Sequence, residues 1–89
     1  MVINLGNEYD EKLRTDLMKI LTENGAEIIE ETWGVGGSQE IDTTSFKLGN
    51  DVISVVSETF IGLSISGPER VVEKIAELLS KGASTNANE

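Results

Sequence analysis

Two stretches of the chain carry apolar residues at helical spacing. In the first, apolar residues recur every three or four positions, which predicts an amphipathic helix over residues 8–23. This stripe consists of Tyr9, Leu13, Leu17, Ile20 and Leu21. Asn7 is its expected N-cap and Gly25 its expected stop. The second stripe predicts a helix that begins at Pro68 and ends at Gly82. Its apolar members are Val71, Val72, Ile75, Leu78 and Leu79.

Between these stretches, β-branched residues, Thr and Ser dominate and turn residues come close together, which is typical of strands joined by short turns. Strands are predicted at residues 2–5, 26–33, 39–48, 52–57 and 61–66. The last strand alternates most clearly, with Ile61, Leu63 and Ile65 on one side and Gly62, Ser64 and Ser66 on the other. A glycine cluster predicts a turn or bulged hairpin loop over residues 34–37. Ile41 and Phe46 would need a bulge between them to share one face.

The predicted order of elements is β-α-β-β-β-β-α. Each amphipathic helix needs an apolar surface to cover, and the sheet supplies one. The sequence therefore predicts an α+β fold, a two-layer sandwich in which two helices cover one face of a largely antiparallel sheet. We expect a single domain over residues 1–82 and a flexible C-terminal tail over residues 83–89, where small polar residues dominate.

The 89-residue chain has no cysteine and no histidine. Disulfides, thiolate nucleophiles and thiolate metal sites are therefore excluded, and the side chain best suited to proton transfer near neutral pH is missing. We expect a protein that is not an enzyme and that uses no cofactor and no metal. The first residues lack the pattern of a signal peptide, and no apolar stretch approaches the ~20 residues that span a bilayer. These features predict a soluble, cytoplasmic protein that does not bind a membrane.

Negative charge is concentrated in the predicted sheet. The whole chain has a net charge of −9, and residues 26–66 carry seven acids against a single base, Lys47. An unpaired carboxylate facing the core is costly, so these acids are expected on the uncovered face, the edges or the hairpin ends of the sheet. The sequence thus predicts an uncovered acidic sheet surface with Ser and Gly interleaved. Such a surface would repel nucleic acid and attract a basic protein. Alternatively, it only confers solubility and keeps sheet edges apart.

The expected binding surface surrounds the predicted turn and comprises Glu30, Glu31, Trp33, Gly36, Glu40 and Asp42. Trp33 is the only tryptophan, and this residue type is enriched at interaction hot spots, although a place at the rim of the core is the alternative. The glycine cluster lacks the following helix and the Lys-Ser/Thr pair of a phosphate-binding loop, which favours a flexible hairpin tip. Glu40 and Asp42 share a strand face and could bind a cation or form an acid–base pair, but no calcium-loop motif accompanies them.

Two stretches of the sequence resemble known families. Residues 63–69 (Leu-Ser-Ile-Ser-Gly-Pro-Glu), followed by an amphipathic helix, resemble the last strand and helix of ferredoxin-like domains, including ACT-type regulatory domains. That resemblance implies a dimeric domain that binds a small molecule. Residues 33–41 (Trp-Gly-Val-Gly-Gly-Ser-Gln-Glu-Ile), together with the small size, the acidity and the lack of cysteine, resemble the immunity proteins of bacterial polymorphic-toxin systems.

The second resemblance implies an acidic, stoichiometric inhibitor of a basic protein such as a nuclease toxin. We therefore expect a non-catalytic protein-binding module whose partner is a basic protein and not a nucleic acid. The alternative is an ACT-like regulatory domain that binds a small molecule as a dimer. The sequence leaves a homodimer open in either case.

Overall fold

The computed structural model describes the backbone of residues 1–87 and the side chains of residues 1–81. Five strands and two helices follow one another in the predicted order β-α-β-β-β-β-α. Their bounds are β1 Val2–Gly6, α1 Glu11–Glu23, β2 Glu27–Gly36, β3 Gln39–Leu48, β4 Asp51–Glu58, β5 Gly62–Ser66 and α2 Glu69–Ala87.

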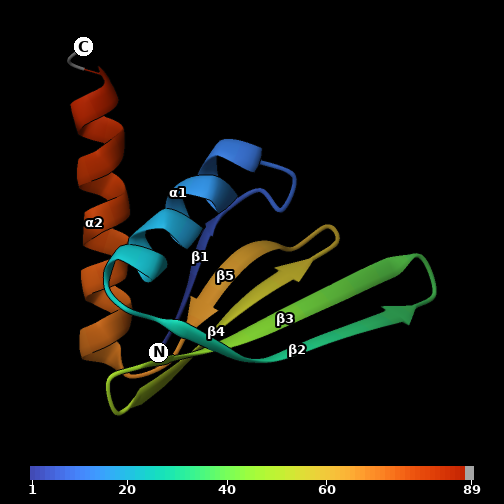
Figure 1. Ribbon diagram of the computed structural model, residues 1–89. Coiled ribbons are helices and arrows are strands. Elements are labelled where there is room, and N and C mark those ends of the chain that lie inside the picture. Colours follow the sequence, from blue (N-terminus) through green and yellow to red (C-terminus); the bar gives the residue numbers. More distant parts are fainter. Residues whose placement is uncertain (88–89) are drawn as a thin grey trace.

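The five strands form one antiparallel sheet in the spatial order β1-β5-β4-β3-β2, so β1 and β2 are its edges (Figure 1). Consecutive strands from β2 to β5 are joined by tight turns, whereas β1 reaches β5 across the rest of the domain. The first and the last strand of the sequence are neighbours in the sheet, where Val2 of β1 lies opposite Ser66 of β5.

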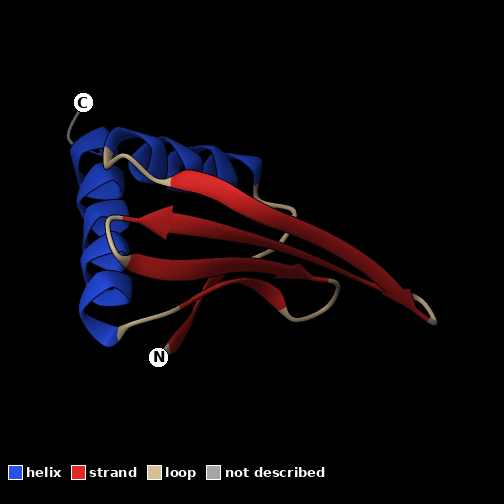
Figure 2. Cartoon of the chain, turned by 60° about the horizontal axis from the view of Figure 1, so that its bottom comes forward, coloured by secondary structure: helices blue, strands red, loops and turns tan. Residues whose placement is uncertain are grey.

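Both helices pack on the same face of the sheet, which confirms the predicted two-layer α+β sandwich (Figure 2). The core between the layers is aliphatic except for one ring, that of Phe46. Its buried members are Leu17 and Leu21 of α1, Val71, Val72 and Ile75 of α2, and Phe46, Ile53, Leu63 and Ile65 of the sheet. The apolar stripes of the two predicted helices thus supply the residues expected of them, apart from Tyr9, which is 72% exposed.

The start of α1 differs from the prediction, while its end agrees. Asp10, not Asn7, is the N-cap, and its side chain accepts a hydrogen bond from the Leu13 amide at 3.0 Å. Asn7 instead accepts from the Tyr9 amide at 2.7 Å, which forms a local turn before the helix. At the other end, Gly25 has a φ of +83° and its amide bonds to the Thr22 carbonyl, as in a glycine-stopped helix.

The second helix runs past the predicted stop. It continues through Gly82 to Ala87, because an interior glycine weakens a helix by only about 1 kcal/mol and the alanines around it favour helix. The flexible tail expected over residues 83–89 stays a prediction, and its last two residues lie outside the described part of the chain. Within the described residues, neither helix is long and apolar enough to cross a membrane.

The hairpin of β2 and β3 is longer than predicted. The extra length is in β2, which continues through Gly34 and Gly36, whereas β3 spans Gln39–Leu48 as predicted. Only Gly37 and Ser38 form the turn, with Gly37 at a φ of +63°. The irregularity in the hairpin lies in β2 near Ile29, where the register with β3 shifts. Ile41 and Phe46 of β3 face opposite sides of the sheet, so no bulge is needed between them.

Candidate functional site

The far half of the β2–β3 hairpin extends beyond both helices. Figures 1 and 2 show the two strands reaching away from α2 and past the end of α1. Every residue of β2 is exposed, and along β3 the side chains change from buried at Phe46 to exposed at Ile41. The molecule is consequently elongated, with dimensions of 42 × 31 × 19 Å. This projecting half carries most of the residues that the sequence singles out.

The strand register divides the six predicted binding residues between two faces. Trp33 lies opposite Asp42, and Glu31 lies opposite Thr44, on the face that the helices cover nearer the core. Glu40 belongs to the same face, since it is two residues from Asp42. The other two predicted residues point the opposite way: Glu30 lies opposite Ser45, and Gly36 lies opposite Gln39. The structure thus brings together Glu31, Trp33, Glu40 and Asp42.

The face of the sheet away from the helices carries three of the seven sheet acids, Glu27, Glu30 and Glu58, around a neutral centre. Its centre is made of hydroxyl and small aliphatic side chains, and Ser45 and Ser54 approach within 3.3 Å across neighbouring strands. The row next to this pair contains Asn4, Ser64, Val56, Thr43 and Thr32. Of the places considered for the acids, the hairpin end on the helix side is where Glu31, Glu40 and Asp42 gather.

A shallow hollow of about 350 Å³ lies where the hairpin meets the start of α1. Its lining combines one indole, two carboxylates and one guanidinium, from Trp33, Glu31, Asp42 and Arg14, with Thr32 and Thr44 completing it. The Arg14 side chain donates to the Glu8 carbonyl at 3.3 Å, so part of its hydrogen-bonding capacity is used at the base of α1. An exposed indole face beside two carboxylates is suited to a cationic side chain.

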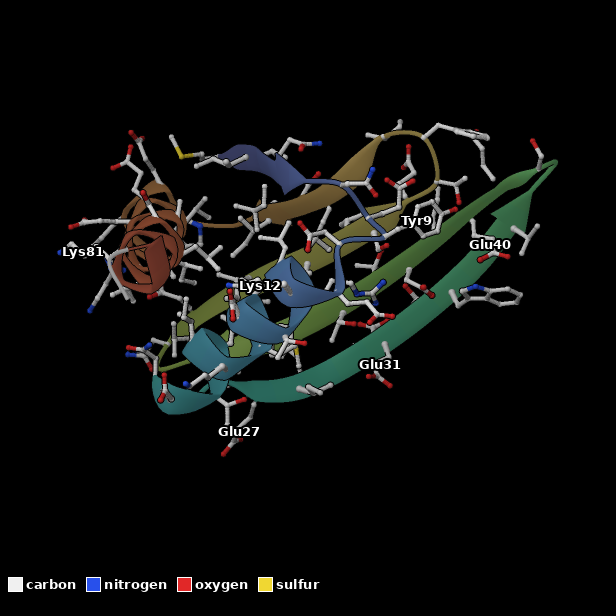
Figure 3. The ribbon with its side chains drawn as sticks, turned by 90° about the horizontal axis from the view of Figure 1, so that it is seen from above. Tyr9, Lys12, Glu27, Glu31, Glu40 and Lys81 are labelled. Atoms are coloured by element: carbon white, nitrogen blue, oxygen red, sulfur yellow. The ribbon has the colours of Figure 1, made fainter. Side chains whose placement is uncertain are left out.

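A second cluster at the same end was not predicted from the sequence. Phe60, in the turn between β4 and β5, is 79% exposed and has a φ of +71°. Its amide donates to the carboxylate of Glu8 at 2.8 Å, and Glu8 is itself buried. Tyr9 follows Glu8, and Figure 3 places Tyr9 and Glu40 at the same end of the molecule, far from Lys81 of α2. Three of the four aromatic residues are therefore exposed at one end of the domain.

Thr59 connects this turn to the hairpin. Its amide donates to the Glu40 carbonyl at 3.0 Å, its hydroxyl accepts from the Glu40 amide at 3.0 Å, and its carbonyl accepts from the Gln39 side chain at 3.3 Å. The turn and the hairpin tip consequently form one surface. The signal in the sequence was the pair Phe60-Ile61 at a turn, where polar residues are usual.

The described residues show no cluster of three acidic side chains that could hold a metal ion. On α2, a hydrogen bond from Lys81 and its charge lower the pKa of Glu77. The arrangement at the hairpin offers exposed aromatic surface, carboxylates and an open strand edge, which are features of binding.

Comparisons with protein-family models, with curated proteins and with solved structures gave no match. The functional argument therefore depends on the geometry of this domain.

Proposed function

We propose that the chain is a non-catalytic protein-binding module that docks on a basic protein through the helix-side face of its projecting hairpin. The observation that carries the proposal is the hollow in which Trp33 stands beside Glu31 and Asp42. Trp33 is 65% exposed, although burying an indole is among the more favourable contributions that a side chain makes to a fold. An exposed tryptophan on a strand outside the core is explained by contact with a partner.

The electrostatics of the domain favour a cationic partner. A lysine or arginine entering the hollow would meet the Glu31 and Asp42 carboxylates and the face of the Trp33 indole. A cation over an indole contributes on the order of 0.5–2 kcal/mol, and more as water is excluded. The net charge of −9 would also steer a basic protein toward the domain and repel nucleic acid.

A stoichiometric inhibitor of a basic enzyme, like an immunity protein, is the form of this function that we favour. An inhibitor of that kind needs a rigid acidic surface and no chemistry of its own. The first requirement is supported at the hairpin tip, where four hydrogen bonds join Thr59 of the β4–β5 turn to Gln39 and Glu40 of β3. Its acidic face could then occupy a groove that normally takes nucleic acid.

Neutralising the helix-side acids tests the proposal. The variant Glu31→Gln, Glu40→Gln, Asp42→Asn should bind a basic protein captured by the wild-type chain at least about tenfold more weakly. The matched control replaces three exposed helix acids, Glu23, Glu69 and Glu73, with Gln and should bind within about twofold of wild type. Wild-type affinity should also fall as NaCl rises from about 50 mM to about 300 mM. Equal affinity for both variants, with no salt dependence, would contradict the proposal.

A second candidate function is a small-molecule-binding regulatory domain that acts as a dimer. A hollow of about 380 Å³ beside α2 favours it, because Arg70 and Lys74 in its lining suit an anionic ligand. The centre of the open face, where Ser45 and Ser54 meet, could form the dimer interface. A stable dimer in sizing experiments, together with a rise in melting temperature on adding an anionic metabolite, would support this function over the first.

A further inference from the structure

The outer edge of β2 is an open strand edge of unusual length. Within the described residues β2 pairs with β3 on one side only, and all ten of its residues are exposed. The register shift near Ile29 separates its first residues from a regular stretch, Glu30–Gly36. Alternate backbone amides and carbonyls of this stretch point away from β3 without a strand to pair with. The other edge, β1, is half as long.

Two glycines in this stretch are not required by the fold. Gly34 and Gly36 do not have positive φ angles, and a Cβ built on either would meet no atom within 4 Å. By contrast, Gly62 has a φ of +120°, and a Cβ there would stand 2.5 Å from the Gly6 carbonyl oxygen. Glycine inside a strand weakens it, and where the fold gives no reason it often marks close approach by another backbone or ligand. Both glycines lie on the open face of the sheet, away from the helices, which also carries Glu30.

The charges of β2 select the kind of strand that could pair with it. Three of its ten residues are acidic and none is basic: Glu27, Glu30 and Glu31. Pairing with β2 of a second copy would bring together two such edges and two chains of charge −9. An extended segment with lysine or arginine would instead gain charge-assisted contacts with Glu31 and stacking on Trp33.

We propose that β2 accepts an extended segment of the basic partner as a sixth strand, paired along Glu30–Gly36. The inference rests on the proposed function and states how the partner docks. Side chains of the added strand alternate between faces. A cationic side chain would lie beside Glu31 on the helix side, and a large apolar side chain would cover Gly34 on the open face away from the helices. These two side chains stand three residues apart in the partner segment.

The experiment uses a synthetic peptide of about eight residues, the length of a common strand, with Lys and Phe three positions apart in a Thr/Val background. Two further peptides carry N-methyl groups on one or the other alternate set of backbone amides. An added strand pairs along only one edge, so one N-methylated peptide should lose binding at least about tenfold and the other should bind like the parent. Failure of the parent peptide to bind at about 1 mM would overturn the proposal, as would equal binding of all three.

Valine substitutions at the glycines give an independent readout. Gly34→Val and Gly36→Val should leave the melting temperature unchanged or raise it by about 2–4 °C, since valine favours strands. The same variants should bind the peptide at least about fivefold more weakly, because their side chains occupy the space of the partner. Thr32→Val, on the same face of β2, is the matched control and should leave binding within about twofold. Gly34→Val and Gly36→Val that bind like wild type would overturn the role of the glycines.

The proposed function and the docking mode fail in different ways. Peptide binding that is lost in the Glu31→Gln, Glu40→Gln, Asp42→Asn variant but unaffected by either N-methyl set would leave the acidic docking site intact and exclude strand addition. Protection of the β2 edge in the free protein, with a mass that rises with concentration, would assign the edge to a second copy. If the charged residues and the bulge of β2 serve only to prevent aggregation at the edge, the peptide will not bind.

Discussion

Phe60 is the one described residue other than glycine with a positive φ, at +71°. The left-handed conformation costs a residue with a Cβ roughly 1–2 kcal/mol, and a side chain that is 79% exposed recovers little of that by burial. The buried carboxylate of Glu8 holds the turn by accepting the Phe60 amide. A strained residue whose ring faces solvent beside a candidate binding surface is consistent with a role in contact.

Replacing Phe60 with glycine should therefore stabilise the free domain. The expected gain in the free energy of unfolding is about 0.5–1 kcal/mol, because relief of strain exceeds the entropy that glycine adds to the unfolded chain. Phe60→Ala keeps the Cβ and the strain, so it serves as the control and should not stabilise. Urea denaturation measures both. A Phe60→Gly variant less stable than Phe60→Ala would show that the ring contributes to the fold.

The N-cap of α1 is a feature that the spacing of apolar residues did not predict correctly. Asp10 accepts from the Leu13 amide, whereas Asn7 serves a turn outside the helix. Asp10→Ala should lower the free energy of unfolding by about 1 kcal/mol, the usual loss for a removed N-cap. Asp10→Asn keeps an acceptor and should lose less, as should Asn7→Ala. Thermal or urea unfolding of the three variants would contradict this assignment if Asn7→Ala proved the most damaging.

Periodicity was sufficient to predict the helices and strands, but not which side chains of the β2–β3 hairpin share a face. The apolar stripes that contain Leu21 and Ile75 could be assigned to helices because burial enforces their spacing. No such constraint acts on β2, where every residue is exposed and alternation carries little information. The shift of register near Ile29 then decides that Glu30 and Glu31 face opposite ways, as neighbours in a strand do. How far the hairpin extends beyond α1 depends on the packing of the whole domain.

In the whole molecule, the buried core that stabilises the fold and the proposed binding surface on the β2–β3 hairpin lie at opposite ends. The residues with no exposed surface are Ile53 and Ile65, in the central strands of the sheet, and Val72, on the inner side of α2. From there burial decreases strand by strand across β4 and β3, and it ends at the fully exposed β2. A domain arranged in this way can lose the pairing of its outermost strand without losing its core.

Amide hydrogen exchange should follow that gradient. We expect amides of β2 in the free protein to exchange at least about a hundredfold faster than those of β5, because opening of an edge strand leaves the core intact. The lysine peptide should slow exchange along Glu30–Gly36, including amides that point away from β3, while β5 remains unchanged. Protection of β2 equal to that of β5 in dilute, peptide-free protein would contradict an open edge. Exchange slowed by the peptide only around Glu31 and Trp33 would favour a cation in the hollow without an added strand.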